Sequence, residues 1–354
     1  MLGTMPNRSP VIVILVAVVA CFALLAGCVP SPENAVVIYS AADREFAAPI
    51  LSAFKRRTLG TEVSSQFDVE SSKTVGLVNR LISEKERVRC DVFWNNEIMH
   101  TLRLDSLGLL ERVQWQVPPD WPESMRGPNG TWIGFAARAR ILIINKNLLP
   151  DPSQWPRSVM ELSSEKWKGK CGVALPLFGT TATHFTVIDS KLGAPAALDW
   201  FQRVKSNAVV LSGNKQVAQS VSAGQLAFGL TDTDDALVEL DNGLNIAIVF
   251  PDQQADELGT LLIPNTLCVL KNSQHPISAR LLASYLLSED VEGRLAMGVS
   301  GQFPIRPNHP QKSRAQTSES VRWMEAEFQT ASQRWPKVSE SLRSIFVGGN
   351  LHGS

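Results

Sequence analysis

The sequence lacks an excess of charge of either sign, because its 34 Lys and Arg residues are balanced by 34 Asp and Glu residues. Nucleic-acid binders normally carry a basic excess that replaces the counterions on phosphates, so this balance argues against such a partner. Low-complexity tracts are also missing, and 44% of the 354 residues are hydrophobic. This is the composition of a globular protein, and the length favours two domains.

Motifs of catalysis are missing too. The sequence contains no GxSxG, no phosphate loop ending in Gly-Lys-Ser/Thr, no HExxH and no glycine-rich dinucleotide turn. Its five histidines are scattered, and His184 falls inside a predicted helix beside no nucleophile motif. We therefore expect no enzymatic activity, and nothing in the sequence indicates a cofactor.

Cysteines that could pair are few in the part of the chain expected to fold. Cys90, Cys171 and Cys268 each stand beside apolar residues at a predicted strand, and none belongs to a CxxC motif. Three cysteines cannot all pair, and buried free thiols behave as small hydrophobic residues. An exported location permits a disulfide, so one bond between two of them stays open, with no pair singled out.

A long apolar run without charge extends from Val11 to Leu25, with Arg8 before it. A run of this length is too short to cross a hydrocarbon core of about 30 Å comfortably, but it suits the hydrophobic region of a signal peptide. The alternative is a plain transmembrane anchor. The run ends in Leu-Ala-Gly-Cys at residues 25–28, which resembles the lipobox of bacterial lipoproteins.

In that class of lipoproteins the cysteine receives a diacylglyceryl group and becomes the first residue after cleavage. The resemblance implies a signal peptide over residues 1–27, a lipid anchor at Cys28 and a short tether over residues 28–35. We therefore expect the protein to be exported and held at the periplasmic or extracytoplasmic face of the cell envelope.

After the tether, short apolar runs alternate with segments of helical periodicity. Strands are predicted over residues 36–40, 62–67 and 91–94, each followed by a helix. Such alternation favours a parallel sheet with helices on both faces. A second region of the same kind begins near residue 172 and ends near residue 250.

Two longer β-rich runs, residues 132–145 and 261–270, connect these regions and predict crossovers in both directions. The fold class that follows is α/β, with two αβ lobes joined by a two-strand hinge and separated by a cleft. The predicted units are residues 36–136 with 262–307 for lobe 1, 137–261 for lobe 2, and 308–354 for a C-terminal helical segment. The last helix of that segment is predicted to carry Val321, Met324, Phe328 and Ala331.

Polar residues stand at the strand-to-helix junctions, where ligands bind in open parallel sheets because helix N-termini point free N–H groups there. The candidate ligand-binding residues at these junctions are Ser40, Asp43, Asn95, Asn96, Thr180, Thr181, Asn214, Asp232 and Asp234. Thr180 and Thr181 follow a glycine, so backbone N–H groups and hydroxyls can converge on an oxyanion, although either threonine can also cap its own helix.

Carboxylates and arginines complete the candidate site. Asp232 and Asp234 would attract cations or sugar hydroxyls, whereas Asp235 is typical of an acidic helix start. Arg138 and Arg140 alternate on one predicted strand and therefore face the same side. We assign Arg138 to the cleft and interpret Arg140 as a solvated edge charge.

Several ordered blocks of the sequence resemble the iron(III)-type periplasmic binding proteins, which are the solute receptors of ABC importers. The blocks are residues 37–43, 91–97, 134–145, 167–170, 176–184, 229–236, 259–266 and 287–292. The resemblance extends from about Val36 to Pro307 and implies the type II periplasmic binding protein fold. It also implies closure of two lobes around a solute that is delivered to a permease and its ATPase.

The resemblance fails at the metal ligands. Iron-binding members of that family use two adjacent tyrosines where this chain has residues 231–235, and the chain contains only Tyr39 and Tyr285. The positions of the family's histidine and glutamate ligands align with Asp43 and Asn96. Ferric coordination by a tyrosine pair is therefore excluded. Other members of the superfamily carry phosphorylated sugars, phosphonates or thiamine.

Three hypotheses remain at this point. The first is a receptor for a small polar solute, phosphorylated, phosphonate or amine-bearing, in which Thr180, Thr181 and Asn214 hold an anionic group and Asp232 and Asp234 hold hydroxyls or an amine. The second is capture of an oxygen-loving metal ion by Asp43, Asn96, Asp232 and Asp234. The third is a sensory module that feeds a signalling partner.

Overall fold

The computed structural model describes residues 35–58, 60–68, 75–316 and 320–348. The apolar run and Cys28 lie outside the described residues. Within them, no helix is both long and apolar enough to cross a membrane. Cys90, Cys171 and Cys268 are buried free thiols, so the disulfide that the sequence left open is not formed among them.

Lobe 1 is built on β1 (Ala35–Ser40), β2 (Glu62–Phe67) and β3 (Val92–Asn95). β1 lies between the other two and pairs with both in parallel. β9 (Leu262–Val269) continues this sheet antiparallel to β3. The predicted parallel arrangement is confirmed for β1, β2 and β3. β9 joins antiparallel because the chain returning from lobe 2 enters the sheet from its opposite end.

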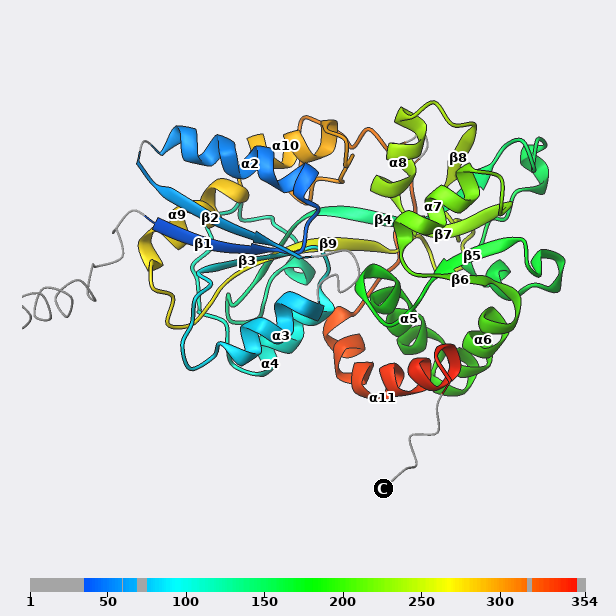
Figure 1. Ribbon diagram of the computed structural model, residues 1–354, viewed down its shortest axis with the longest axis horizontal. Coiled ribbons are helices and arrows are strands. Elements are labelled where there is room, and N and C mark those ends of the chain that lie inside the picture. Colours follow the sequence, from blue (N-terminus) through cyan, green and yellow to red (C-terminus); the bar gives the residue numbers. More distant parts are fainter. Residues whose placement is uncertain (1–34, 59, 69–74, 317–319, 349–354) are drawn as a thin grey trace, which may run out of the picture.

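β4 (Ile133–Asn145) is a strand of 13 buried residues that belongs to both lobes. Its first half pairs with β9, and its second half pairs with β7 and β8. β4 and β9 run side by side between the lobes (Figure 1). A strand buried on both faces has a nearly continuous apolar sequence, and this made both crossovers recognisable. The two predicted crossovers are confirmed as β4 and β9.

Lobe 2 contains β5 (Cys171–Ala174), β6 (Val209–Leu211), β7 (Phe228–Asp232) and β8 (Ile246–Val249). β5 lies between β6 and β7 and is parallel to both, and β7 is antiparallel to β4. The strand order of the whole sheet is β2-β1-β3-β9-β4-β7-β5-β6, with β8 on β4. β6 was not predicted, because a strand of three residues leaves no periodic signal.

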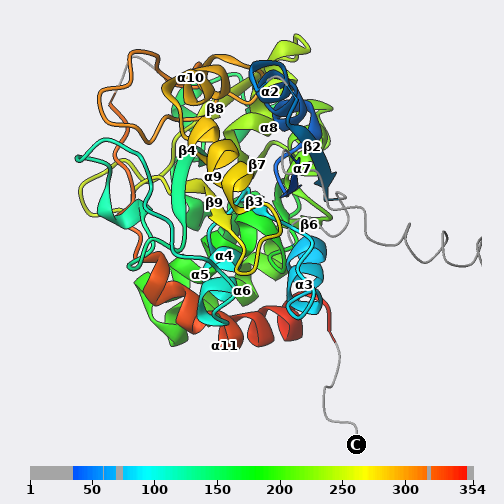
Figure 2. The same ribbon diagram turned by 90° about the vertical axis from the view of Figure 1, so that its left-hand side faces the viewer.

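Helices cover both faces of each lobe (Figures 1 and 2). In lobe 1, residues of α2 (Arg44–Arg57), α9 (Pro276–Leu286) and α10 (Glu289–Met297) share one core, and residues of α3 (Val75–Ser83) and α4 (Met99–Ser106) share another. In lobe 2, α5 (Gly179–Leu192) and α6 (Ala194–Asn207) share one core, and α7 (Asn214–Ser222) and α8 (Thr233–Asp241) share the other. Short 3₁₀ helices span Glu123–Met125, Pro152–Gln154, Val159–Ser163 and Glu165–Trp167.

The C-terminal helix α11 (Phe328–Phe346) begins later than predicted. Met324 is not helical, because its N–H donates to the carbonyl of Thr260 at 2.9 Å and the chain beside it runs parallel to that segment. α11 packs on α5 and α6, and its Trp335 meets His100 of α4 edge to face, with 6.4 Å between ring centroids. The helix therefore contacts both lobes (Figure 1).

Candidate functional site

A cavity of about 400 Å³ opens at the carboxyl ends of β5 and β7. Its walls come from the first turns of α5 and α7, the end of β7 and the start of α8. Arg138 enters from the shared strand β4, and Asn96 enters from lobe 1. The cavity thus lies where the two lobes meet, at the sheet edge that the junction residues predicted.

Two helix N-termini converge on this cavity. α5 starts at Gly179, whose φ of 55° suits glycine, and Phe178 precedes it at the N-cap position. α7 starts at Asn214, with Gly213 at the N-cap position. Neither phenylalanine nor glycine has a side chain that accepts a hydrogen bond, so neither residue caps the first N–H groups of its helix. Both helices direct partial positive charge at the same space.

Asp232, the last residue of β7, organises the floor of the cavity. Its Oδ1 accepts a hydrogen bond from Nη1 of Arg140 at 2.7 Å. Its Oδ2 accepts one from the Thr180 hydroxyl at 2.6 Å and one from the Asn214 amide at 3.0 Å. Burial raises the pKa of Asp232, but the arginines and these hydrogen bonds outweigh burial and hold it below its usual range. Asp232 is therefore ionised, with both oxygens engaged.

Arg140 is fully buried beneath the cavity. Besides Asp232, its guanidinium donates to the hydroxyls of Thr180 at 3.2 Å and Thr181 at 3.1 Å. The interpretation of Arg140 as a solvated edge charge was wrong. β4 is not an edge strand at this point, because it pairs with β7 and bonds to the chain at Leu261, and Thr180 and Thr181 of α5 lie against the guanidinium. The period-two spacing that placed both arginines on one side was the signal for its true position.

Arg138 lines the cavity, as the sequence predicted, and it also bridges the lobes. Its Nη1 lies 3.1 Å from Oδ2 of Asp234 and 3.7 Å from Oδ2 of Asp232. Its Nη2 donates to the backbone carbonyl of Asn96. Burial lowers the pKa of Arg138, but Asp234, Asp232 and Asp43 outweigh burial and raise it, so the guanidinium stays charged.

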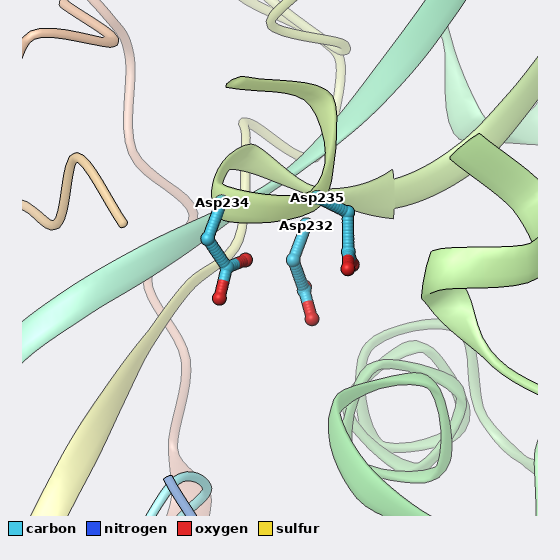
Figure 3. Close-up of side chains that lie close together, drawn as sticks. All are labelled: Asp232, Asp234 and Asp235. Atoms are coloured by element: carbon cyan, nitrogen blue, oxygen red, sulfur yellow. The ribbon is translucent and has the colours of Figure 1, made fainter. Parts of the chain in front are cut away.

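Three aspartates cluster at the junction of β7 and α8, with one carboxylate oxygen of each within 4.8 Å of the others. Their side chains extend to the same side of the junction (Figure 3). Asp234 bonds to Arg138, and Asp235 accepts a hydrogen bond from the Thr231 hydroxyl at 3.1 Å. Asp232 and Asp235 line the cavity, whereas Asp234, which the sequence assigned to the site, does not. The sequence assigned Asp235 only to the helix start.

The remaining predicted site residues lie elsewhere. The Ser40 side chain is fully buried at the end of β1 and is not part of the cavity wall. Asn95 is the last residue of β3 and points into lobe 1, where its amide donates to Glu97 at 3.1 Å and Thr101 at 3.0 Å. Asn96, the residue after the end of β3, lines the cavity instead. Asp43 stands before α2, outside the cavity wall but close enough to act on the charge of Arg138.

Several wall residues were not predicted. Lys215 and Gln216 occupy the first turn of α7, and the side chain of Phe178 is 37% exposed at the cavity. Lys215 could have been found from the sequence, because it directly follows Asn214, where a helix was predicted to start. Lys215 adds a positive charge to a wall that already contains Arg138 and two helix N-termini.

A direct side-chain bond joins the lobes beside the cavity. The Thr183 hydroxyl of α5 donates to Oε2 of Glu97 at 2.9 Å. Glu97 is fully buried and also accepts the N–H groups of Met99 and His100, which starts α4. His184, next along α5, is buried, and burial together with Arg140 lowers its pKa well below the usual value, so it is uncharged.

The sequence matches a family of known proteins. Residues 101–330, well over half of the chain, match the family described as bacterial extracellular solute-binding protein. Iron uptake protein A1 of Synechocystis is 24% identical over 308 residues, covering 81% of this chain and 83% of the relative. The phosphoglycerate transport regulatory protein PgtC of Salmonella typhimurium is 24% identical, covering 76% of this chain and 66% of the relative.

Solved structures share the fold. Iron-bound HitA from Pseudomonas aeruginosa superposes with a TM-score of 0.74 at 23% identity, covering 88% of this chain and 99% of HitA. AfuA from Actinobacillus pleuropneumoniae, with exogenous fructose-6-phosphate bound, superposes with a TM-score of 0.76 at 17% identity, covering 89% of this chain and 99% of AfuA. At these identities the likeness shows the fold, which is that of the type II periplasmic binding proteins.

Proposed function

The chain belongs to the bacterial extracellular solute-binding protein family, and from this premise we propose that it is an importer receptor for a small solute with a phosphate or phosphonate group. The observation that carries the proposal is the convergence of two uncapped helix N-termini on one cavity. A volume of about 400 Å³ is in the range of small-molecule sites. The two lobes would close around the solute by bending of β4 and β9.

The anionic group would lie between the first turns of α5 and α7. Helix N-termini offer N–H donors and partial positive charge, which together bind oxyanions. The N–H groups of residues 179–181 and 214–216 belong to residues of the cavity wall. Lys215 supplies a full positive charge to the same wall, and Arg138 adds a guanidinium whose charge is shared with Asp234 and Asp232. A phosphate or phosphonate has enough oxygen atoms to engage both helices at once.

The rest of the solute would carry hydroxyl or amine groups. Asp235 and Asn96 also line the cavity and can accept hydrogen bonds from such groups. Asp232 has a different task from the one the sequence suggested, because both its oxygens are engaged by protein groups. It holds Thr180, Asn214 and Arg140 in place beneath the solute.

Two relatives support a phosphorylated solute. PgtC is named for phosphoglycerate transport, and the AfuA structure contains fructose-6-phosphate. Each of these statements concerns the relative alone. A phosphorylated solute is consistent with a cavity wall that contains two helix N-termini, Arg138 and Lys215.

Capture of a metal ion is the second candidate, since other relatives are named as iron uptake proteins. The donor set here does not fit a multivalent cation. Asp232 and Asp234 are each bound to an arginine, and Asn96 turns its backbone carbonyl to Arg138. A cation at the three aspartates would approach two fixed guanidinium groups, which repel it.

Export, anchoring at Cys28, delivery to an ABC permease with its ATPase, and the lack of enzymatic activity are parts of the same proposal. A receptor whose described helices do not cross a membrane would be held near its permease by a lipid anchor. Mass spectrometry of protein extracted from membranes tests the anchor. Diacylglyceryl on Cys28 is expected, and an unmodified Cys28 in membrane-extracted protein contradicts it.

Titration calorimetry tests the solute class. We expect at least one phosphorylated or phosphonate compound to bind, and its unphosphorylated counterpart to bind at least about 100-fold more weakly. Arg138→Gln should weaken binding of the anionic compound, while Lys337→Gln, at an exposed position of α11, should not. A folded protein that binds none of the phosphorylated or phosphonate compounds contradicts the proposal.

A further inference from the structure

A β-bulge interrupts the shared strand β4 two residues before Arg138. Phe135 pairs with Asn265 and Ala137 pairs with Pro264, so Ala136 is an extra residue without a partner on β9. Its φ is 36°, a left-handed value that is uncommon for any residue other than glycine. A bulge bends and twists its strand and redirects the side chains that follow.

The extra residue decides which way the arginines face. Residues opposite each other on paired strands point to the same face of the sheet, and Arg138 stands opposite Ile263. If β4 continued from Phe135 without the bulge, Ala137 would stand opposite Ile263. Arg138 and Arg140 would then both point to the other face, away from the cavity.

Two buried side chains hold the bulge in place. The N–H of Ala136 donates to Oε1 of Glu292 at 2.9 Å, and its carbonyl accepts a hydrogen bond from the Asn265 amide. Glu292 is in α10 and Asn265 is in β9, so separate elements satisfy the two backbone groups that the bulge removes from the ladder. A buried backbone group left without a partner is costly, which ties the bulge to these side chains.

Glu292 is itself fixed. Its Oε1 also accepts the N–H of Ile305 at 2.8 Å, and its Oε2 accepts the N–H of Arg306 at 3.2 Å. The chain beyond it bonds back to β4, because Phe303 and Ala137 exchange backbone hydrogen bonds of 2.7 Å. Glu292 is fully buried and is not part of the cavity wall. Its carboxylate therefore serves the backbone of the hinge.

We propose that Glu292 is a positioning residue for the solute site, which acts by holding the Ala136 bulge and so turning Arg138 into the cavity. The inference rests on the proposed function insofar as Arg138 contacts the solute. Under this proposal the orientation of Arg138 depends on the carboxylate of Glu292 in α10 of lobe 1. Loss of the carboxylate should act on the site through Arg138.

A double-mutant cycle on the full chain tests this coupling, with inorganic phosphate as the probe. We expect Glu292→Leu to weaken phosphate binding by about tenfold, and to change it by less than about twofold when Arg138→Gln is already present. Glu292→Gln keeps one acceptor oxygen and should recover most of the affinity. Equal losses in both backgrounds overturn the proposal, because they show an effect that does not pass through Arg138.

A pair of variants at the bulge keeps the test decisive if Glu292→Leu does not fold. Ala136→Gly tolerates a positive φ and should bind phosphate as the unmodified protein does, whereas Ala136→Val opposes it and should bind about tenfold more weakly. Asp91→Asn is the matched control, since Asp91 is a buried carboxylate of lobe 1 that accepts the N–H of Val37 at 2.7 Å. Val37 is in β1, which is separated from β4 by β3 and β9. Equal binding by both Ala136 variants overturns the proposal.

A crystal structure of solute-free Glu292→Leu or Ala136→Val separates this inference from the proposed function. If the unmodified protein binds no phosphate, the proposed anion site is wrong. The pairing register of β4 in the variant structure still shows whether Glu292 holds the bulge. The proposal predicts that Arg138 no longer stands opposite Ile263 or no longer contacts Asp234. An unchanged register with Arg138 in place overturns it.

Discussion

Nη1 of Arg140 lies 2.7 Å from Oδ1 of Asp232, and the two side chains are 0% and 2% exposed. Other groups satisfy most of the hydrogen-bonding atoms of this buried pair, and Nε of Arg140 is left without a partner among the described residues. Thr180 and Asn214 engage the second carboxylate oxygen, and Thr181 engages the second guanidinium nitrogen. The pair joins β4, β7, α5 and α7 directly beneath the cavity.

Removing Asp232 should therefore destabilise the whole protein. Asp232→Ala leaves two buried guanidinium groups short of a carboxylate, so we expect the free energy of unfolding to fall by about 3–5 kcal/mol. Urea denaturation followed by circular dichroism measures it. Asp199→Ala, which breaks an exposed pair with Arg203, is the control and should change stability by less than about 1 kcal/mol. Similar losses in the two variants contradict this account of the pair.

The bond between Thr183 and Glu97 should favour contact between the lobes. Thr183→Val removes the hydroxyl, and we expect a larger radius of gyration in small-angle scattering and about fivefold weaker phosphate binding. Thr186→Val is matched, because the Thr186 hydroxyl donates within α5 to the carbonyl of Ala182 at 2.8 Å. Identical scattering from the two variants speaks against a role for Thr183 in lobe contact.

Asp252 should make stability depend on pH. Burial raises its pKa to about 6, so the folded state binds a proton more tightly than the unfolded state. Stability is then lost as pH rises from the unfolded pKa of about 4 through about 6. Asp252→Asn, neutral throughout, should gain about 2 kcal/mol relative to the unmodified protein between pH 4.5 and 7.5. A difference that stays constant across this range refutes the prediction.

Metal ions should not stabilise the protein. Because arginines already neutralise Asp232 and Asp234, we expect added Fe³⁺ or Mg²⁺ to shift the Tm by less than about 1 °C, and a chelator to have no effect. Thermal denaturation monitored by fluorescence measures this. A clear rise in Tm that Asp235→Asn abolishes favours the metal hypothesis instead.

Much of the fold could be predicted, because it depends on local patterns. The alternation of apolar strands and amphipathic helices marked both lobes, and the long apolar run of β4 marked the crossover. The start of α11 could not be predicted in this way. Met324 is held extended by a backbone bond to Thr260, 64 positions earlier in the chain, and such a long-range partner overrides local helical spacing.

The site was only partly predictable for a related reason. Thr180, Asn214 and Asp232 were found because strand ends and helix starts meet at one edge of the sheet. Side-chain direction at that edge depends on non-local pairing. Asn95 points inward and Arg140 is buried because of neighbours on other strands and a bulge at Ala136, which residue spacing alone does not reveal.

Affinity of Gly213→Asp for a phosphorylated solute tests the central claim most directly. An aspartate at this N-cap position would cap α7 with its own carboxylate and occupy the place of the bound anion. The proposed function predicts an unchanged or higher Tm, with binding weakened by at least about tenfold. Gly213→Asn, a neutral cap of the same shape, should lose less. Binding by Gly213→Asp as tight as that of the unmodified protein would contradict an anion site between these two helices.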